Sequence, residues 1–307
     1  MRLHHIDIAK GIGILAVVAL HANFHLEWMT AFEMPLFFLL SGIFVKVSVP
    51  FKEYLIKKIN MLLVPYVFFE SPKLIYDAYF ALTHKGVSFI DSYINSSLPT
   101  ATWFLLALFL SQIMCYPLLR VVERTFVKVL LAILMFAGGY AFSAFQLPNV
   151  MYVGSAITLS SFLLLGNALR IQLKTLPAVA IWVMVLAGLA CLSLCWVIYN
   201  ADAAFILYRS NQIVANLWAA LLMGFLGSGG VILLSASLRR SKLLEYYGCN
   251  SLIVLGAHLY FVVTLQRLSL IKHAWVLFLV VCVVVLPVIY LLKKYLPQLC
   301  GAKPLIK

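Results

Sequence analysis

Long apolar stretches constrain this chain more than any other feature of its sequence. An α-helix needs ~20 residues to cross the hydrocarbon core of a bilayer. The chain has 307 residues, of which 64% are hydrophobic and 11% charged, and its mean hydropathy is +1.04, far above that of soluble domains. Ten stretches of suitable length cover residues 8–24, 32–47, 59–80, 101–119, 126–145, 151–169, 176–199, 213–236, 251–266 and 274–292. We therefore expect an all-α polytopic membrane protein with about ten transmembrane helices.

The basic residues favour one orientation of these helices. If the N-terminus is cytoplasmic, eighteen of the 23 Lys and Arg residues lie at the inner face, Lys73 lies within a span, and only Lys85, Arg209, Arg267 and Lys272 lie outside. Cytoplasmic loops of membrane proteins typically carry such an excess of Lys and Arg over the outer loops. Both termini are therefore predicted to be cytoplasmic. The net charge of +13 then reflects membrane topology rather than binding of nucleic acid.

The loops and the cysteines add no second unit or metal site. No loop is long enough for a separate soluble domain, so residues 1–307 are expected to form a single membrane domain. The six cysteines have neither the spacing of a disulfide framework nor that of metal ligands. A cleavable signal peptide is disfavoured at the N-terminus, because Asp7 lies in its charged region and no small-residue cleavage site follows Leu20.

Ionisable side chains inside the apolar stretches are candidate functional residues, because burying them in lipid is costly. They are His21, Glu70, Lys73, Asp77 and His258. A neutral imidazole at His21 could take a proton from a hydroxyl, or it could simply bond a neighbouring helix. Glu70, Lys73 and Asp77 lie on the third stretch and share one helix face. They either neutralise one another or line a polar cavity for the acceptor. His258, by itself, is typical of a core histidine.

Lys10 and His21 share one face of the first predicted helix. Their separation of eleven residues brings them within about 20° of each other around the helix and roughly 16 Å apart along it. This arrangement predicts a site entered from the cytoplasmic side, with its chemistry deeper in the bilayer. Alternatively, Lys10 pairs with Asp7 and only anchors the helix. Glu33, at the start of the second stretch, is the better of two nearby acids to orient the imidazole.

Five segments together resemble the acyltransferase-3 family of integral membrane acyltransferases. The run DIAKGIGILAVVALH at residues 7–21 and the run FEMPLFFLLSG at 32–42 resemble the opening of that family, and most closely its fucose 4-O-acetylase-like branch. The segments KKINMLLVPY at 57–66, TWFL at 102–105 and SLIVLGAH at 251–258 resemble later motifs in the same order. Lys10 stands where many members have arginine, so the charge is kept without the bidentate geometry. Glu33 stands where relatives often have histidine.

The resemblance implies transfer of an acetyl or other short acyl group from acyl-CoA in the cytoplasm to a sugar hydroxyl of an envelope or extracellular glycan, in the bacterial inner membrane. It implies that His21 acts as general base or as a covalent acyl relay. Together, the polar residues and the resemblance give a predicted site, with Glu33, Glu70, Lys73 and Asp77 included on their positions alone. It consists of His21 and Glu33 for catalysis, Lys10, Lys57, Lys58 and Ser41 for the acyl-CoA, and Glu70, Lys73, Asp77, Trp103 and His258 for the acceptor.

Two other classes of function remain possible on the sequence. An exporter of exopolysaccharide or lipid-linked sugar would use the intramembrane charges to line a substrate path. The absence of visible inverted repeats and the Lys10 to His21 stripe favour the enzyme instead. A structural or sensory membrane component would leave that stripe without a role.

Overall fold

The computed structural model describes residues 3–84, 86–94, 100–175, 179–269 and 271–306. Arg2, Lys85 and Lys307, which belong to the charge pattern above, lie outside these ranges. So do residues 176–178 of the predicted span 176–199.

The long apolar stretches form helices, which confirms the all-α membrane fold. In the described residues, seven helices are long and apolar enough to cross a bilayer. They are α1 (His4–His21), α6 (Trp103–Val121), α7 (Thr125–Ala144), α8 (Val153–Ala168) with its preceding turn η3 (Val150–Tyr152), α10 (Ile181–Ala201), α11 (Leu217–Ser237) and α14 (Ala274–Tyr295). An eighth is possible if α12 (Lys242–Cys249) and α13 (Ser251–Arg267), which meet at 84°, form one broken span.

Two of the ten predicted stretches form helices that differ from a simple apolar span. Helix α2 (Glu33–Gly42) has ten residues, which is about 15 Å and half of a bilayer core, so it is shorter than the predicted span 32–47. Helix α4 (Val64–Thr83) is long enough but carries three ionisable residues. It continues α3 (Phe51–Lys58) through a π-helical turn, η2 (Ile59–Leu63). The count of ten spans and the cytoplasmic position of both termini stay predictions.

The remaining elements are short and lie between the long helices. They are η1 (Glu27–Ala31), α5 (Phe89–Ile94), α9 (Arg170–Lys174), β1 (Phe205–Leu207) and β2 (Gln212–Val214). The two strands pair antiparallel with Ile206 opposite Ile213, and both isoleucines are buried. A segment predicted as an outer loop is therefore a hairpin that packs into the helical body.

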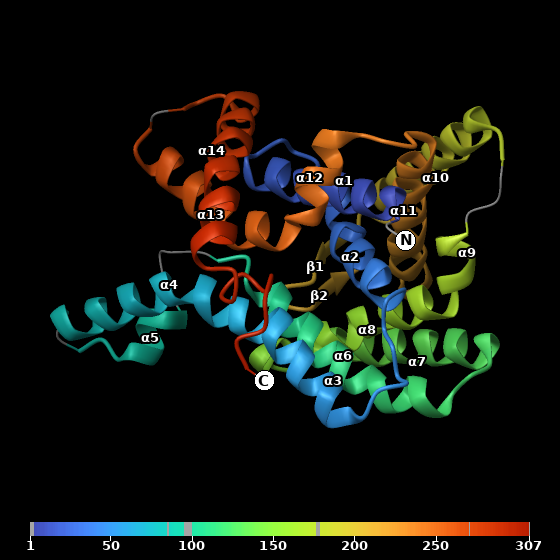
Figure 1. Ribbon diagram of the computed structural model, residues 1–307, viewed down its shortest axis with the longest axis horizontal. Helices are drawn as coiled ribbons and strands as arrows, with labels where there is room; N and C mark the ends of the chain where they lie inside the picture. The colour runs from blue at the N-terminus through green and yellow to red at the C-terminus, as the bar shows by residue number, and fades with distance from the viewer. Residues whose placement is uncertain (1–2, 85, 95–99, 176–178, 270, 307) are drawn as a thin grey trace.

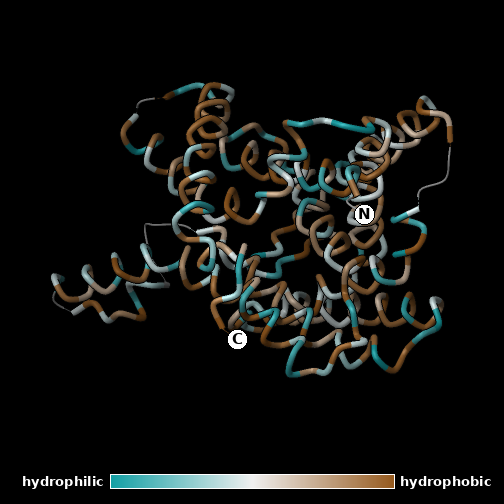
Figure 2. Tube along the Cα trace, in the orientation of Figure 1, coloured by the Kyte–Doolittle hydropathy of each residue, from teal (hydrophilic) through white to brown (hydrophobic). Residues whose placement is uncertain are grey.

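Helices α1 and α8 lie at the centre of the packing (Figure 1). Helix α8 packs against α2, α6 and α7, and α1 packs against α2, α11, α12 and α13. The pair α4 and α5 extends away from this body. In Figure 2 the long helices are mainly hydrophobic, while hydrophilic residues gather in connections and near helix ends. This distribution is the one expected of helices surrounded by lipid.

Glycines permit the closest of these helix contacts. A Cβ on Gly11 of α1 would overlap the carbonyl oxygen of Leu244 in α12, and a Cβ on Gly248 of α12 would overlap the carbonyl oxygen of Asp7 in α1. Small residues of this kind let the backbones of two helices touch. They bring α12, and with it the start of α13, against the helix that carries Lys10 and His21.

Candidate functional site

One face of α1 lines two adjoining cavities. Lys10 and Ile14 line the first, which has a volume of about 390 Å³, and Val17 and His21 line the second, of about 330 Å³. We call them the Lys10 cavity and the His21 cavity. These four residues follow the spacing of a single helix face, as the sequence predicts for Lys10 and His21.

The two cavities meet at a common wall. Phe104 of α6 and Leu255 of α13 line both of them. A ligand that extends along α1 from Lys10 toward His21 would therefore pass these two side chains. The structure thus places a cation and a titratable base in neighbouring spaces on one helix.

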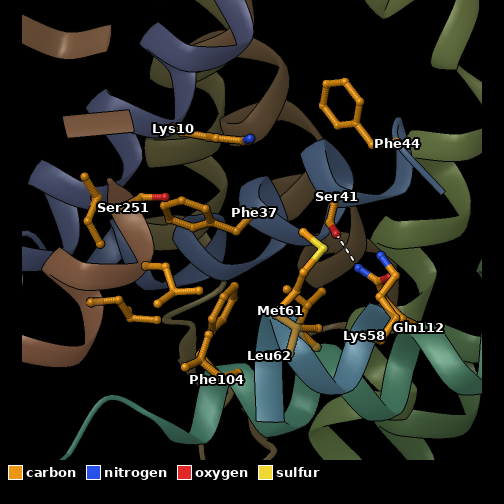
Figure 3. Close-up of a pocket in the computed structure, with 15 residues that line it drawn as sticks. Lys10, Phe37, Ser41, Phe44, Lys58, Met61, Leu62, Phe104, Gln112 and Ser251 are labelled. Carbon is orange, nitrogen blue, oxygen red and sulfur yellow. Dashed lines mark hydrogen bonds between the residues drawn. The ribbon is translucent and has the colours of Figure 1, made fainter. Parts of the chain in front are cut away.

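The Lys10 cavity collects the positive charge expected of an anion site (Figure 3). Lys10, Lys58 and Ser41 line it, whereas Lys57 is exposed and is not among its lining residues. The apolar part of the wall comes from α1, α2, α6, α13, the π-helical turn and Phe44, which follows α2. The other lining residues are Ile14, Phe37, Phe44, Met61, Leu62, Phe104, Leu105, Leu108, Gln112, Ser251, Leu252 and Leu255.

Lys58 is a buried cation at the wall of the Lys10 cavity. Its side chain is 9% exposed and its Nζ lies 5.0 Å from the centre of the Tyr54 ring. Burial, with a smaller contribution from the neighbouring charge of Lys57, lowers the pKa of Lys58 to about 8. The ammonium is therefore poorly balanced by this protein's own groups, which favours binding of an anion beside it.

A further cation, Lys174, lies near the Lys10 cavity beside Phe44. Lys10 Nζ lies 5.5 Å from the centre of the Phe44 ring, and Lys174 Nζ lies 5.6 Å from it. Two ammonium groups near one ring concentrate positive charge at the Lys10 end of the site. Lys174 had no predicted role, because it is close to this cavity only in the folded chain.

A chain of hydrogen bonds holds Ser41 at the wall of the Lys10 cavity. The Tyr54 hydroxyl donates to Gln112 Oε1 at 2.8 Å, and Gln112 Nε2 donates to Ser41 Oγ at 2.6 Å (Figure 3). Since Ser41 accepts from Gln112, its own hydroxyl proton is available for a ligand. Neither Gln112 nor Tyr54 was among the residues predicted for the site.

The His21 cavity contains polar groups that the sequence predicted separately. His21, Glu33 and Trp103 all line it. The hairpin closes one side of it through Ile206, Leu207, Tyr208 and Arg209. The other lining residues are Val17, Thr30, Met34, Thr100, Ala101, Phe104, Leu255 and Leu259.

Hydrogen bonds between side chains and backbone carbonyls hold the hairpin over the His21 cavity. The Tyr208 hydroxyl donates to the Ala31 carbonyl at 3.2 Å, and the Arg209 carbonyl accepts from Asn149 Nδ2 at 3.0 Å. The sequence treated Arg209 only as a charge in an outer loop. In the structure it is an exposed cation at the edge of the cavity that contains His21.

His21 is paired with His258. His258 Nε2 lies 3.2 Å from His21 Nδ1, and the two ring centres are 5.1 Å apart. His21 Nδ1 is also 2.9 Å from the Val17 carbonyl oxygen, and His258 Nδ1 is 2.8 Å from the Val254 carbonyl oxygen. The histidine that looked like a core residue in the sequence therefore contacts the predicted base.

Glu33 lies in the same cavity but is not joined to the imidazole. Its Oε2 atom is buried and has no hydrogen-bond partner among the described residues. The hydrogen bonds of His21 go to Val17 and His258 instead. A buried carboxyl oxygen without a partner is costly, so this atom of Glu33 is available for a hydrogen bond with a ligand. Its predicted catalytic role stays a prediction.

The charged residues of α4 form a separate network. Lys73 Nζ lies 3.2 Å from Asp77 Oδ2 and donates to the Tyr93 carbonyl at 2.9 Å. Glu70 accepts from the Tyr93 hydroxyl at 3.1 Å and from the hydroxyl of Thr102. These contacts join α4 to α5 and to the start of α6, and none of the three α4 residues is among those lining the two cavities.

Comparison with known protein families identifies one match for this chain. A model described as an acyltransferase domain, that of the acyltransferase-3 family, matches residues 3–294. The chain belongs to this family. No curated protein and no solved structure is significantly similar to it.

This acyltransferase is therefore an integral, multi-pass membrane enzyme of acyl transfer. The matched residues run from α1 into α14 and include both cavities. Among the described residues of the acyltransferase, no three His, Cys, Asp or Glu side chains group closely enough to hold a metal ion.

Proposed function

We propose that this protein is an O-acyltransferase that moves an acetyl or other short acyl group from acyl-CoA to a sugar hydroxyl of an envelope or extracellular glycan, in the inner membrane of a bacterium. The observation that carries the proposal is the single face of α1 that lines both cavities, with Lys10 in one and His21 in the other. The two substrates would occupy these two spaces and meet at Phe104 and Leu255.

The Lys10 cavity is proposed as the donor site. Lys10 and Lys58 would bind phosphate groups of acyl-CoA as point charges. Ser251 is the first residue of α13 and lines the same cavity, so the N-terminal end of a helix also faces the anion. The distance from Lys10 to His21, roughly 16 Å along the helix, suits an extended pantetheine arm with its thioester near His21.

The His21 cavity is proposed as the acceptor site. Trp103 offers an aromatic surface and Glu33 a hydrogen-bond acceptor, and this is the combination of groups that suits a pyranose ring. The charged network of α4 reaches this side only through Thr102. Its hydroxyl donates to Glu70, and its oxygen lies 3.1 Å from the hydroxyl oxygen of Thr100, a residue of the cavity wall.

The chemistry requires only one proton acceptor. His21 Nε2 takes the hydroxyl proton as the hydroxyl oxygen attacks the thioester carbon. The C–S bond breaks, an ester C–O bond forms, and the proton passes from His21 to the departing CoA thiolate. A general base of this kind contributes about 10² to 10⁴ in rate. In the covalent alternative, Nε2 first attacks the thioester carbon, CoA leaves as the thiolate, and the hydroxyl then takes the acyl group from His21 and gives its proton to the thiolate.

The test compares acyl transfer by His21→Ala and wild-type protein. Membranes containing each protein are supplied with isotope-labelled acetyl-CoA, and CoA release and glycan acylation are measured by mass spectrometry. We expect His21→Ala to lose at least about 100-fold in acyl transfer at an unchanged amount of protein in the membrane. His273→Ala, at an exposed histidine, is the matched control and should keep wild-type activity.

Two results would contradict the proposal. One is glycan acylation by His21→Ala at the wild-type rate. The other is glycan export that depends on this protein without any consumption of acyl-CoA, which is the behaviour of an exporter.

A further inference from the structure

We propose that His258 is a positioning residue for His21, which it holds with the proton on Nδ1 and the basic lone pair on Nε2. The inference rests on the proposed function of His21 as the base or nucleophile of acyl transfer. The sequence analysis predicted that His258 contacts the acceptor. The inference instead gives His258 a role toward His21.

The hydrogen-bond pattern allows one neutral arrangement of protons. The Nδ1 atom of each ring faces a backbone carbonyl, Val17 for His21 at 2.9 Å and Val254 for His258 at 2.8 Å. A carbonyl only accepts hydrogen bonds, so each Nδ1 carries the proton. His258 Nε2 then has a lone pair, which accepts from His21 Nδ1 at 3.2 Å.

The reverse arrangement is unfavourable at two places. If His258 donated from Nε2 to a bare His21 Nδ1, the lone pair of that Nδ1 would face the Val17 carbonyl. The neutral His258 would then also have a bare Nδ1 facing the Val254 carbonyl. Each contact would set two acceptors against one another without a proton between them. The pair therefore keeps His21 Nε2 as the atom that accepts a proton or attacks a carbonyl.

The same contact supports His21 after it has taken a proton. The imidazolium carries protons on both nitrogens, and its Nδ1–H keeps two acceptors, Val17 O and His258 Nε2. A hydrogen bond from a charged donor is about twice as strong as a neutral one. No carboxylate among the described residues is hydrogen-bonded to His21, so His258 supplies the side-chain acceptor.

The fold keeps His258 in this position. Its side chain is 0% exposed, and its neighbours on α13, Leu255 and Leu259, both line the His21 cavity. Helix α13 therefore fixes the ring between the cavity wall and α1.

The experiment compares His258→Leu with His258→Gln. Leucine fills similar space without an acceptor, whereas the glutamine side-chain oxygen can reach the place of Nε2. We expect His258→Leu to lower kcat by about 10- to 100-fold with the KM for acetyl-CoA changed less than about twofold. The kcat of His258→Gln should be at least about fivefold higher than that of His258→Leu, because glutamine restores the hydrogen-bond acceptor. His4→Gln is the control for a histidine-to-glutamine substitution outside the two cavities, at a histidine bonded to Glu245.

A second measurement does not depend on acyl transfer. Diethyl pyrocarbonate reacts with an unprotonated imidazole nitrogen, and mass spectrometry of peptides reports its rate at each histidine in the purified protein. We expect slower modification of His21 in His258→Leu and a rate near that of wild type in His258→Gln, with exposed His25 and His273 as internal references. If leucine prevents folding, His258→Met removes the acceptor with a more adaptable apolar chain.

The two failures can be told apart. Equal kcat values in wild type, His258→Leu and His258→Gln would overturn the positioning role, as would equal modification rates at His21 in all three proteins. An equally large loss in both variants would also overturn it, because packing alone would then explain the effect. A third outcome is that wild type transfers no acyl group, while diethyl pyrocarbonate still modifies His21 more slowly in His258→Leu than in His258→Gln. In that case the proposed function fails and the pairing of the two histidines stands.

Discussion

At the scale of single residues, Lys58 combines a buried position with a charge that its own surroundings do not balance. Its pKa, lowered to about 8 by burial, places its titration close to working conditions. The charged form is present below that pKa and is lost as the pH rises through it. A phosphate-binding role for Lys58 would therefore weaken in mildly alkaline solution.

The pH dependence of donor use follows from this shift. We expect the KM for acetyl-CoA to rise by up to about tenfold between pH 7 and pH 9, because only about one tenth of Lys58 stays charged one unit above its pKa. In Lys58→Arg, whose guanidinium stays charged throughout, the rise should disappear. Steady-state kinetics at fixed ionic strength measure both.

Lys57, the exposed neighbour of Lys58, serves as the control for this prediction. Lys57→Arg keeps the adjacent charge and should leave the pH dependence unchanged. A rise in KM that is the same in Lys58→Arg and in wild type would exclude Lys58 as the titrating group.

Residue-scale features differ in how far the sequence could predict them. The Lys10 to His21 stripe could be predicted, because helical periodicity fixes which residues of one helix share a face. The contact between His21 and His258 could not, because it joins residues 237 positions apart in the chain. Arg209 and Tyr54 had no local pattern to mark them, and only packing brings them to the cavities or their supports.

At the scale of helices and strands, the contact between α1 and α12 decides where α13 begins. Gly11 and Gly248 allow the two backbones to touch, and α13 then leaves at 84° to α12. That direction puts Ser251 in the Lys10 cavity and His258 beside His21. The site therefore depends on two glycines that lie outside it.

Alanine at either glycine should destabilise the protein. The added Cβ of Gly11→Ala or Gly248→Ala would overlap a backbone carbonyl, and overpacking of this kind costs about 1–3 kcal/mol. We expect a lower midpoint of thermal unfolding in detergent, followed by tryptophan fluorescence. Gly229→Ala in α11 is the matched control, because nothing lies within 4 Å of its Cβ position. An unfolding midpoint of Gly11→Ala equal to that of Gly229→Ala would contradict the close contact.

The helices themselves were largely predictable, and their irregular parts were not. Ranges such as 101–119 and 126–145 agree closely with α6 and α7, because long apolar runs in lipid have few alternatives to a helix. Helix α2 ends early, where the Gly42 carbonyl accepts from Val45 N in a local turn and from Asn167 Nδ2 of α8 at 3.3 Å. The hairpin depends on the body that buries Ile206 and Ile213.

At the scale of the whole molecule, the proposed reaction requires that the two cavities serve opposite sides of the membrane. The charge pattern predicts that the Lys10 end is cytoplasmic, and so are both termini. A fusion of green fluorescent protein to the C-terminus should therefore fluoresce, while a fusion of alkaline phosphatase at the same place should be inactive. Active phosphatase in that fusion would contradict the predicted orientation and the cytoplasmic entry of acyl-CoA.

The sequence by itself determined that this chain is a helical membrane protein and that Lys10 and His21 share one helix face. Both follow from local causes, since apolar composition sets the solvent and helical periodicity sets the faces. Only the tertiary structure decided that His258 contacts His21, that Ser41 is held by Gln112, and that two cavities adjoin at Phe104 and Leu255. These features join distant segments, and their positions depend on how closely the helices can pack.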